Sequence, residues 1–454
     1  MRKILILLVG LLATSHAMAA DKVRPNIIFI LADDLGPGDI GCYGGTLAKT
    51  PNIDQLAKEG TRYDQYYVAS PVCSPSRCAL ITGQFPALWN ITSYLAEKKR
   101  NDGAEMANFL DPKAPSLPRQ LKEAGYRTAH FGKWHLGGGR DVTDAPKFAA
   151  YGYDEHAGTY ESPEPDPDIT ATNWIWSPKD KFKRWERTRF FVDKTLDFLR
   201  RNSDQPCFVN LWFDDVHTPW IPNADAQKEK NPNITKNLKP VISEMDQQVG
   251  RLMHGLKELG IDDRTLVVFT SDNGPYPPLP GRTVGFRGCK FSLYEGGLRL
   301  PFIARWPGVI PADVTDTATV LASVDMLPTL CHIAGAKLPS GVAFDGADMS
   351  NALRGTRTVG RERPLMWEYG RNATFFGYPK LPKDHSPNLA IRDGNWKLLV
   401  NADGENTELY DLASDPSEAK NVAKDHPELA ARLRSDVVDW RKSMPTRMQT
   451  TGSN

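Results

Sequence analysis

Four short apolar runs along the chain each end in a cluster of polar residues. Such continuous runs are typical of β-strands that are buried on both faces, as in a parallel sheet. The runs and their clusters are 26–32 with Asp33-Asp34, 128–131 with Gly132-Lys133-Trp134-His135, 207–213 with Asp214-Asp215-Val216-His217, and 265–270 with Ser271-Asp272-Asn273-Gly274. The pattern therefore predicts four strands, each followed by a polar loop.

Amphipathic helical patterns separate these runs, and they lie at residues 52–59, 117–124, 188–201 and 239–259. Alternating strands and helices predict an α/β fold in which a large, mostly parallel central sheet is flanked by helices. In such folds, ligands bind beyond the carboxyl ends of the strands. We therefore expect the four polar clusters to meet at one edge of the sheet and to form a site there.

The character of the chain changes near residue 365. Residues 389–400, which contain Asp393-Gly394, are typical of a β-hairpin, residues 407–412 of a further strand, and Pro427–Ser443 of an amphipathic helix. We expect a catalytic domain at 20–365 and a smaller α+β domain, with an antiparallel sheet and a helix, at 366–454. A proline-rich stretch at 162–181 is predicted to form a surface excursion.

The first 19 residues have the pattern of a secretory signal peptide. Arg2 and Lys3 precede the apolar run 4–13, and Ala17-Met18-Ala19 is a suitable cleavage site. Ten apolar residues are too few to span a bilayer, which takes about 20. The pattern predicts export without a membrane anchor, to the periplasm of a bacterium or to a lysosomal or secreted location in a eukaryote.

The balance of charges narrows the possible partners. The formal net charge is +1, and removal of residues 1–19, with Arg2 and Lys3, changes it to −1. This excludes a strongly basic nucleic-acid binder. The chain has only six cysteines, which is too few for a disulfide scaffold in a protein of 454 residues.

The segment Cys73-Ser74-Pro75-Ser76-Arg77 carries the most specific local pattern. Pro75 suits the first turn of a helix, which places Cys73 just before the helix N-terminus, where backbone N–H groups favour an anion. Arg77 adds a positive charge one turn further. The alternative is a capped helix with a buried or disulfide-bonded cysteine.

Two acidic clusters suit a metal ion. Asp33, Asp34, Asp272 and Asn273 offer hard oxygen ligands, which favour Ca²⁺ or Mg²⁺ over Zn²⁺. A single Asp-Asp pair after a strand is more often a turn or a helix cap. That alternative does not explain why a second acidic cluster follows another strand.

These motifs together resemble those of the type I sulfatases of the alkaline-phosphatase superfamily, in the branch of the arylsulfatases and N-acetylgalactosamine-sulfatases. Residues 73–77 resemble the family signature C-x-P-S-R. The further matches, in chain order, are residues 25–36 with Asp33 and Asp34, Gly132-Lys133-Trp134-His135-Leu136-Gly137, His217-Thr218-Pro219-Trp220, Asp272-Asn273-Gly274, Lys290 within residues 288–297, and Leu409-Tyr410-Asp411-Leu412 with Asn421 near the C-terminus. The resemblance implies an alkaline-phosphatase-like fold.

The resemblance also implies the cofactors. Cys73 matches the cysteine that a formylglycine-generating enzyme, or an equivalent maturase, converts to Cα-formylglycine. The implied metal is Ca²⁺, with Mg²⁺ as the less favoured alternative, and its implied ligands are Asp33, Asp34, Asp272, Asn273 and the formylglycine oxygen at position 73.

The family mechanism assigns roles to the remaining motif residues. One hydroxyl of the hydrated aldehyde attacks sulfur, while Arg77, Lys133, Lys290 and the metal stabilise the charge. His217 or Lys290 can protonate the departing alcohol, and His135 is a candidate base for the step that expels sulfate. Taken singly, Lys133 and His135 would more often be surface or structural residues.

Residues that contact the rest of the substrate are harder to assign from sequence. Trp220, Trp89 and Tyr94 could stack on a sugar ring, although core packing is the alternative for each. Arg282, Arg371 and His385 could contact anionic or hydroxyl groups, or could be solvated loop residues. The loop 369–383, rich in Gly, Pro and aromatic residues, is expected to help wall the pocket.

The leading hypothesis is an exported sulfatase that acts on a carbohydrate sulfate ester. Two alternatives stay open at this point. One is a phosphonate or phosphate ester hydrolase of the same superfamily, and the other is a non-catalytic, secreted glycan-binding protein with an unmodified Cys73.

Overall fold

A large sheet forms the centre of the molecule. The computed structural model describes residues 24–230, 235–356 and 361–446, so the predicted signal segment lies outside the described residues. Within the described ranges, nine strands pair in the order β4-β3-β5-β1-β6-β7-β2-β8, with β9 also paired to β2. The strands are β1 (Asn26–Ala32), β2 (Thr61–Tyr67), β3 (Arg127–Gly132), β4 (Glu155–Gly158), β5 (Cys207–Trp212), β6 (Thr265–Ser271), β7 (Arg299–Arg305), β8 (Val314–Asp316) and β9 (Leu321–Ala322). Only β7 is antiparallel to its neighbours, so the predicted fold class is confirmed.

Strand β1 illustrates why the apolar runs form buried strands. Its alternate residues enter two separate cores: Ile27 and Phe29 pack on one side of the sheet, and Ile28 and Ile30 pack on the other. The four predicted strands correspond to β1, β3, β5 and β6. Strands β2 and β7 were not predicted, because charged and polar residues interrupt their apolar pattern.

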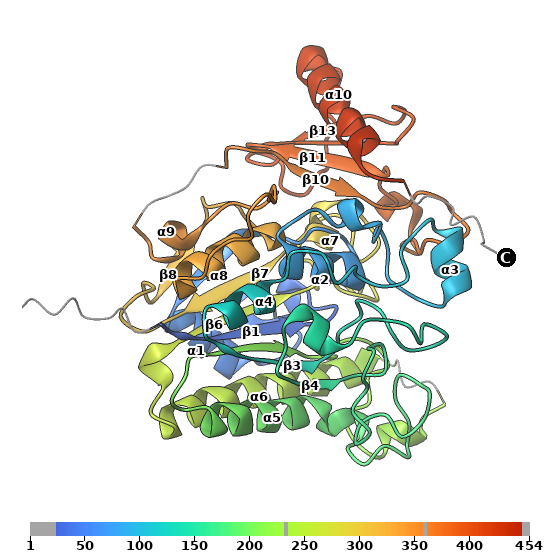
Figure 1. Cartoon of the computed structure of the whole chain (residues 1–454). Coiled ribbons are helices and arrows are strands. Elements are labelled where there is room, and N and C mark those ends of the chain that lie inside the picture. The colour runs from blue at the N-terminus through green and yellow to red at the C-terminus, as the bar shows by residue number, and fades with distance from the viewer. Residues whose placement is uncertain (1–23, 231–234, 357–360, 447–454) are drawn as a thin grey trace, which may run out of the picture.

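Helices cover both faces of the sheet (Figure 1). Helices α1 (Pro51–Lys58), α5 (Arg187–Arg201) and α6 (Leu238–Glu258) cover one face, and they confirm three of the predicted helices to within two residues. Helices α2 (Cys73–Thr82), α4 (Leu117–Glu123) and α8 (Met326–Ala334) cover the other face. The shorter helices are α3 (Lys98–Gly103), α7 (Glu295–Leu298) and α9 (Ser350–Leu353).

A small antiparallel sheet lies beside this body, and the last helix covers its outer face (Figure 1). Its strands are β10 (Leu365–Glu368), β11 (Leu389–Asp393), β12 (Trp396–Val400) and β13 (Glu408–Asp411), and the helix is α10 (Pro427–Ser443). Leu398 packs outward under Leu433 of α10, whereas Leu399 packs inward against the main core. The predicted hairpin and terminal helix are confirmed, while the domain division at 365/366 stays a prediction.

The proline-rich stretch 162–181 contains neither helix nor strand, but it is not simply a surface excursion. Ile169 is fully buried, and the buried Asp180 carboxylate accepts a hydrogen bond from Arg187 at 3.0 Å. The prediction was wrong for these positions, because proline content reports the lack of regular structure and not exposure.

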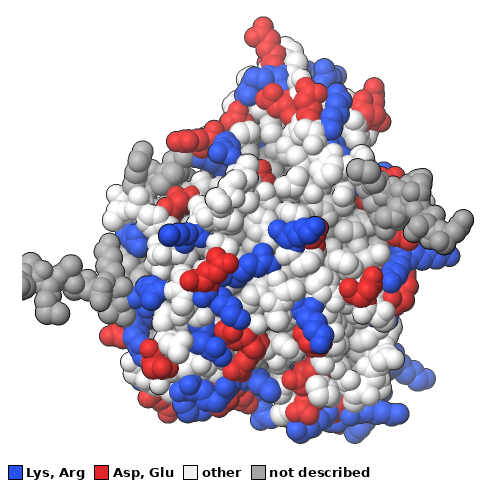
Figure 2. Space-filling view, in the orientation of Figure 1, with Lys and Arg blue, Asp and Glu red and all other residues white. Residues whose placement is uncertain are grey.

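The described surface carries mixed charges, and the cysteines form no disulfide bonds. Acidic and basic side chains are interspersed on the face shown in Figure 2. All six cysteines lie in the described ranges and carry free thiols. Among the described residues, no helix combines the length and apolarity needed to cross a membrane.

A buried ionic cluster joins the small sheet to the main body. Lys397 of β12 lies 2.9 Å from Glu295 of α7 and 2.9 Å from Glu418, and all three side chains are inaccessible to solvent. Glu418 also accepts a hydrogen bond from the Glu295 backbone N–H at 2.6 Å, and Tyr67 of β2 donates to Glu295 at 2.5 Å. The small sheet is therefore fixed to the segment that leads from Lys290 into α7.

This cluster generates a prediction about pH. Burial raises the pKa of Glu418 to about 7 against the charge of Lys397, and the nearby Glu295 raises it further. The folded chain then keeps a proton that the unfolded chain releases near pH 4.5. The contribution of Glu418 to stability is therefore fully present below about pH 4.5 and is lost as the pH rises through about 7. We expect Glu418→Gln to remove this part of the pH dependence, measured as urea-unfolding midpoints between pH 5 and pH 8.

The exposed Glu405, in the same part of the chain, provides the matched control. Glu405→Gln should leave the slope of the wild-type curve unchanged. Parallel curves for wild type and Glu418→Gln would contradict the assignment.

Candidate active site

The carboxyl ends of four adjacent strands meet at one edge of the large sheet. Backbone hydrogen bonds continue past the strand ends: Asp33 N–H donates to Asp215 O at 2.9 Å, and Asp272 N–H donates to Ala32 O at 3.2 Å. Lys133 N–H donates to Trp212 O at 2.8 Å. The sheet register therefore brings the predicted polar clusters together in space.

Helix α2 presents Cys73 at this edge. Cys73 is the first residue of the helix, whereas the prediction placed it just before the helix, so α2 begins one residue earlier than predicted. Pro75 stands in the first turn. All ten residues of α2 are buried, and the helix ends at Gly83, whose φ of 68° suits glycine. Burial raises the pKa of the Cys73 thiol to about 11, although Lys133 and Lys290 oppose this shift, so the unmodified side chain is a protonated thiol at neutral pH.

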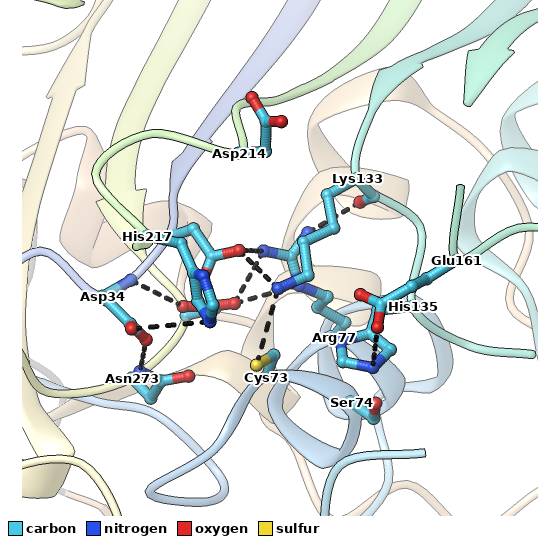
Figure 3. A network of polar contacts seen from close by, with 12 residues as sticks. Asp34, Cys73, Ser74, Arg77, Lys133, His135, Glu161, Asp214, His217 and Asn273 are labelled. Carbon is cyan, nitrogen blue, oxygen red and sulfur yellow. Dashed lines mark hydrogen bonds and ion pairs between the residues drawn. The ribbon is translucent and has the colours of Figure 1, made fainter. Parts of the chain in front are cut away.

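Three buried carboxylates are matched by three buried cations. Arg77 binds Asp272 through Nε at 2.9 Å and Nη2 at 2.6 Å. The Lys133 amine lies 2.6 Å from Asp33 Oδ2, and the Lys290 amine lies 2.7 Å from Asp34 Oδ1. Figure 3 shows Lys133 reaching toward Cys73 and the His217 ring reaching toward Asp34, and the Lys133 amine is 3.7 Å from the Cys73 sulfur.

The pKa values of the carboxylates reflect this crowding. Burial alone would raise the pKa of Asp33, but the charges of Lys133, Arg77 and Lys290 outweigh it and hold the pKa far below its usual range. Burial and the neighbouring Asp33 raise the pKa of Asp272 to about 6 despite its bond to Arg77.

The predicted metal ligands form a set that fits a hard cation. One oxygen each from Asp33 and Asp272 and the sulfur of Cys73 lie within 4.8 Å of one another. Asp33 Oδ1 and Asn273 Oδ1 are buried and have no hydrogen-bond partner in the described part of the chain. Asn273 donates from its amide nitrogen to Asp34 at 2.6 Å, which leaves its oxygen free as a ligand. Such oxygens suit Ca²⁺ or Mg²⁺.

The two predicted catalytic histidines each use one ring nitrogen on a backbone carbonyl. His217 bonds Thr218 O through Nδ1 at 2.6 Å, and its Nε2 lies 3.8 Å from Asp34. His135 bonds Leu95 O through Nε2 at 2.9 Å, and its Nδ1 has no partner among the described residues. Carbonyls accept hydrogen bonds, so the second nitrogen of each neutral ring is free to accept a proton.

Both rings are held in the neutral form. Burial lowers the pKa of His135 to about 3, although Glu161 opposes the shift. Burial and Lys290 also lower the pKa of His217. The His217 side chain is 31% exposed whereas that of His135 is 6% exposed, so His217 is the more accessible of the two.

A cavity of about 200 Å³ opens above these groups. The predicted residues that line it are Asp33, Cys73, Tyr94, Lys133, His135, His217 and Lys290. Arg77 does not line it and is fully buried, so its role is to hold Asp272 and not to touch a ligand. Asp34, Asp272 and Asn273 lie beneath the floor and are also fully buried.

Several lining residues escaped the sequence analysis. They are Arg140, Tyr160, Glu161, Arg184, Asp214 and Phe291. Asp214 stood in a noted polar cluster, and its carboxylate is held by Arg184 at 3.1 Å and Arg187 at 2.9 Å. Glu161, which Arg140 binds at 2.7 Å, has no local signal, because it is brought to the cavity only by the pairing of β4 with β3.

Backbone conformation at the site is unusual. Asp34, His135 and Phe291 have φ values of 61°, 53° and 75°. Non-glycine residues in this left-handed region cost about 1–3 kcal/mol each and occur at functional sites. All three adjoin or belong to the predicted catalytic set.

Most of the predicted substrate contacts do not reach the cavity. Trp220 is fully buried and donates to Val216 O at 2.8 Å, so it is a core residue. Arg282 is 1% exposed, binds Asp39 at 2.7 Å, and donates to Asp34 O at 2.9 Å, so it supports the metal-ligand loop from behind. The sequence reveals the suitable residue types but not their burial.

Two further predicted contacts lie in the loop after β10, and one aromatic lies near α3. Arg371 pairs with Glu368 at 2.7 Å, and His385 bonds Pro379 O at 2.6 Å. Trp89 packs against the main core. None of the three lines the cavity, nor does the loop 369–383, in which Tyr369 instead packs behind Phe291 at a ring distance of 6.5 Å.

Comparison with known proteins identifies the relatives of this chain. The family model described as Sulfatase matches residues 25–336, and the model described as N-sulphoglucosamine sulphohydrolase, C-terminal, matches residues 287–443. The chain is 30% identical to N-acetylgalactosamine-6-O-sulfatase of Bacteroides thetaiotaomicron, over 92% of this chain and 93% of that protein. It is 31% identical to human arylsulfatase A, over 93% of this chain and 89% of that protein.

A solved structure agrees with these relatives. The crystal structure of Ps i-CgsB in complex with k-i-k-neocarrahexaose superposes with a TM-score of 0.75 at 27% identity, and 95% of each chain is covered.

The buried ion pairs of the site generate a stability prediction. Arg77→Met should lower the free energy of unfolding by about 3–5 kcal/mol, because it leaves the Asp272 carboxylate without its charge partner in a dry interior. The control Arg62→Met breaks a pair with Asp64 whose two side chains are each 26% exposed. It should cost about 1 kcal/mol or less. Chemical denaturation of both variants tests this, and equal losses would contradict it.

Proposed function

Because the chain belongs to the sulfatase family, we propose that it hydrolyses the sulfate ester of a sulfated saccharide with a formylglycine made from Cys73. The observation that carries this proposal is the position of Cys73 on the cavity floor, at the N-terminus of α2 and 3.7 Å from the Lys133 amine. Members of the family are sulfuric ester hydrolases.

Two lines of argument support a saccharide substrate. The similar proteins include an N-acetylgalactosamine-6-O-sulfatase and a structure in complex with a neocarrahexaose. The upper wall of the cavity also offers acceptors on Asp214 and Glu161 and donors on Arg140 and Arg184. Such paired acceptors and donors suit the hydroxyl groups of a sugar.

The site residues support the chemistry in distinct ways. The hydrated aldehyde of formylglycine supplies two hydroxyls, one that can attack sulfur and one through which sulfate can later be expelled. Lys133 and Lys290 line the cavity as fixed cations, since neighbouring carboxylates raise their pKa values against the effect of burial. They are placed to stabilise the charge on a sulfuryl group. Arg77 positions Asp272, and it also lies 3.4 Å from Asp33 and donates to Lys133 O at 2.7 Å.

Two proton carriers are available on the cavity wall. His217 is the more exposed, and its Nε2 is the ring nitrogen left free, so it can serve the departing alcohol once Nε2 has taken up a proton. The Lys290 amine, which carries its proton, is the alternative donor. His135 lies deeper, with Nδ1 free, and we assign it as the base in the step that expels sulfate.

The metal proposed for the site is Ca²⁺, held by Asp33, Asp34, Asp272 and Asn273 together with position 73. It supplies Lewis-acid stabilisation of negative oxygen. Three buried cations already balance three buried carboxylates here, so a divalent ion leaves the site positive and suited to an anionic ester.

The proposed function also requires export of the chain and conversion of Cys73. The pattern of residues 1–19 supports export, with the periplasm as the proposed compartment in a bacterium. Conversion of Cys73 requires a formylglycine-generating enzyme or an equivalent maturase.

Sulfate release tests the proposed function. Protein produced together with a formylglycine-generating enzyme should release sulfate from at least one member of a set of defined sulfated saccharides, and mass spectrometry should detect formylglycine at position 73. Cys73→Ala should release none, because the nucleophile is gone. Cys78→Ala is the matched control, since Cys78 is a buried cysteine of the same helix that does not line the cavity.

Parallel assays separate the alternatives. Hydrolysis of phosphate or phosphonate esters alone would favour the related hydrolase. Modified protein without hydrolysis of any ester, or an active Cys73→Ala variant, would contradict the proposal.

Metal binding is tested by thermal unfolding. After removal of metal with a chelator, Ca²⁺ should raise the unfolding temperature, since ligand at a hundredfold excess over Kd stabilises by about 2.7 kcal/mol. Asp34→Asn should lose most of this shift, whereas Asp263→Asn, at an exposed position, should keep it. A larger shift with Mg²⁺ would identify Mg²⁺ as the favoured ion.

A further inference from the structure

A second hollow, of about 190 Å³, is lined by residues of the small sheet and of the β2–β8 edge of the large sheet. Its wall includes three arginines, Arg361, Arg363 and Arg392, and contains no aspartate or glutamate among its described residues. It shares no lining residue with the catalytic cavity. It is therefore a separate cationic hollow.

Arg392 of β11 is the central feature of this hollow. Its side chain is buried, with 3% of the residue exposed, and its guanidinium lies over the Tyr67 ring at 4.6 Å. Nε donates to Gly394 O at 3.0 Å and Nη2 donates to Gln65 at 2.6 Å. Nη1 has no hydrogen-bond partner in the described part of the chain.

An unused donor on a buried guanidinium is unusual, because leaving such a group unsatisfied costs about 1–3 kcal/mol or more. The hydrogen bonds to Gly394 and Gln65 fix the plane of the guanidinium. Arg392 lines the hollow, and Nη1 is the buried guanidinium nitrogen that these hydrogen bonds leave without an acceptor.

The neighbouring arginines differ in how far they are neutralised. Arg361 forms two parallel bonds with Asp325, at 2.8 Å and 2.9 Å, and is charge-balanced. Arg363 is exposed, and one of its nitrogens donates to Phe344 O at 2.9 Å. No ion pair of Arg363 or Arg392 within 4.0 Å occurs among the described residues, so both contribute positive charge to the hollow.

The carboxylate behind Arg392 does not cancel that charge. The charges of Lys397, Arg299 and Arg392 lower the pKa of Glu295 against the effect of burial. Glu295 is bound by Lys397 at 2.9 Å and lies 3.6 Å from Arg299. Its negative charge is thus shared among three cations, and Glu295 does not line the hollow.

We propose that this hollow is a second oxyanion site, which binds a sulfate or carboxylate group carried by an anionic saccharide. Guanidinium groups bind such oxyanions through parallel hydrogen bonds. Ala318, Val320 and Leu365 supply an apolar wall that suits the C–H face of a sugar ring better than a free hydrated ion. The saccharide source rests on the proposed function, whereas the binding of an oxyanion does not.

Such a site has a consequence for long substrates. A chain that engages the second site while another residue occupies the catalytic cavity binds as a bivalent ligand. A saccharide too short to reach both sites gains nothing. The site therefore acts on KM for long anionic chains and leaves kcat for short substrates unchanged.

Calorimetric titration at constant ionic strength tests the proposal with three probes. The probes are sodium sulfate, a sulfated hexasaccharide and the same hexasaccharide without sulfate. Wild type should bind sulfate at two sites, one of them in the catalytic cavity. Arg363→Ala and Arg392→Gln should each weaken the second site about tenfold, the effect of losing one contact worth about 1.4 kcal/mol. The desulfated hexasaccharide should not occupy it.

The matched control is Arg434→Ala, which removes an exposed arginine from α10 outside the hollow. It should keep both sites. If Arg392→Gln fails to fold, Arg363→Ala decides, because Arg363 is exposed. Tighter binding of the sulfated hexasaccharide than of sulfate at the second site supports a saccharide ligand, and equal or weaker binding overturns that source.

A single sulfate site in wild type, or an unchanged second site in Arg363→Ala, would overturn the oxyanion site itself. Sulfate release from a short substrate is measured alongside. If wild type releases no sulfate from the short substrate, the result counts against the proposed function and not against the second site.

Discussion

The constraint on which the site depends is the repulsion between carboxylates that the sheet forces together. Strands β1 and β6 are adjacent and parallel, so Asp33, Asp34 and Asp272 meet at one edge with no freedom to separate. In a dry interior, like charges at this distance cannot all stay ionised without compensation. Arg77, Lys133 and Lys290 arrive from three other segments to supply it. The three cations that offset the repulsion between these carboxylates also supply positive charge at the site of an anion.

The small sheet takes part in this arrangement, although it contributes no lining residue to the cavity. Lys290 is carried by a segment that the C-terminal part of the chain holds at several points. Ser386 accepts from the Leu293 backbone at 2.9 Å, and Glu418 accepts from the Glu295 backbone at 2.6 Å. Because the backbone of this segment is fixed, the position of the Lys290 amine depends on residues more than ninety positions away. The second sheet is therefore part of the catalytic architecture, and not an appendage.

Much of this could be predicted from the sequence, for identifiable reasons. The four central strands are continuous apolar runs, and the polar residues after them must meet because parallel strands end at the same edge. The motif around Cys73 is local and specific, so its helix was predicted to within one residue. In contrast, Trp220 and Arg282 were misassigned because burial is a property of the whole fold. Glu161 and Arg140 reach the cavity only through the long loop around β4, and no periodicity in the sequence records that path.

Helix α2 is buried along its entire length, and this sets an order of events for the chain. The maturation enzyme of the proposed function would have to reach the Cys73 side chain that it converts. Once α2 is packed under the sheet, Cys73 is only 2% exposed. In the proposed function, the conversion of Cys73 must therefore come before folding is complete. A molecule that folds first would keep its thiol and, under the proposed function, would stay inactive.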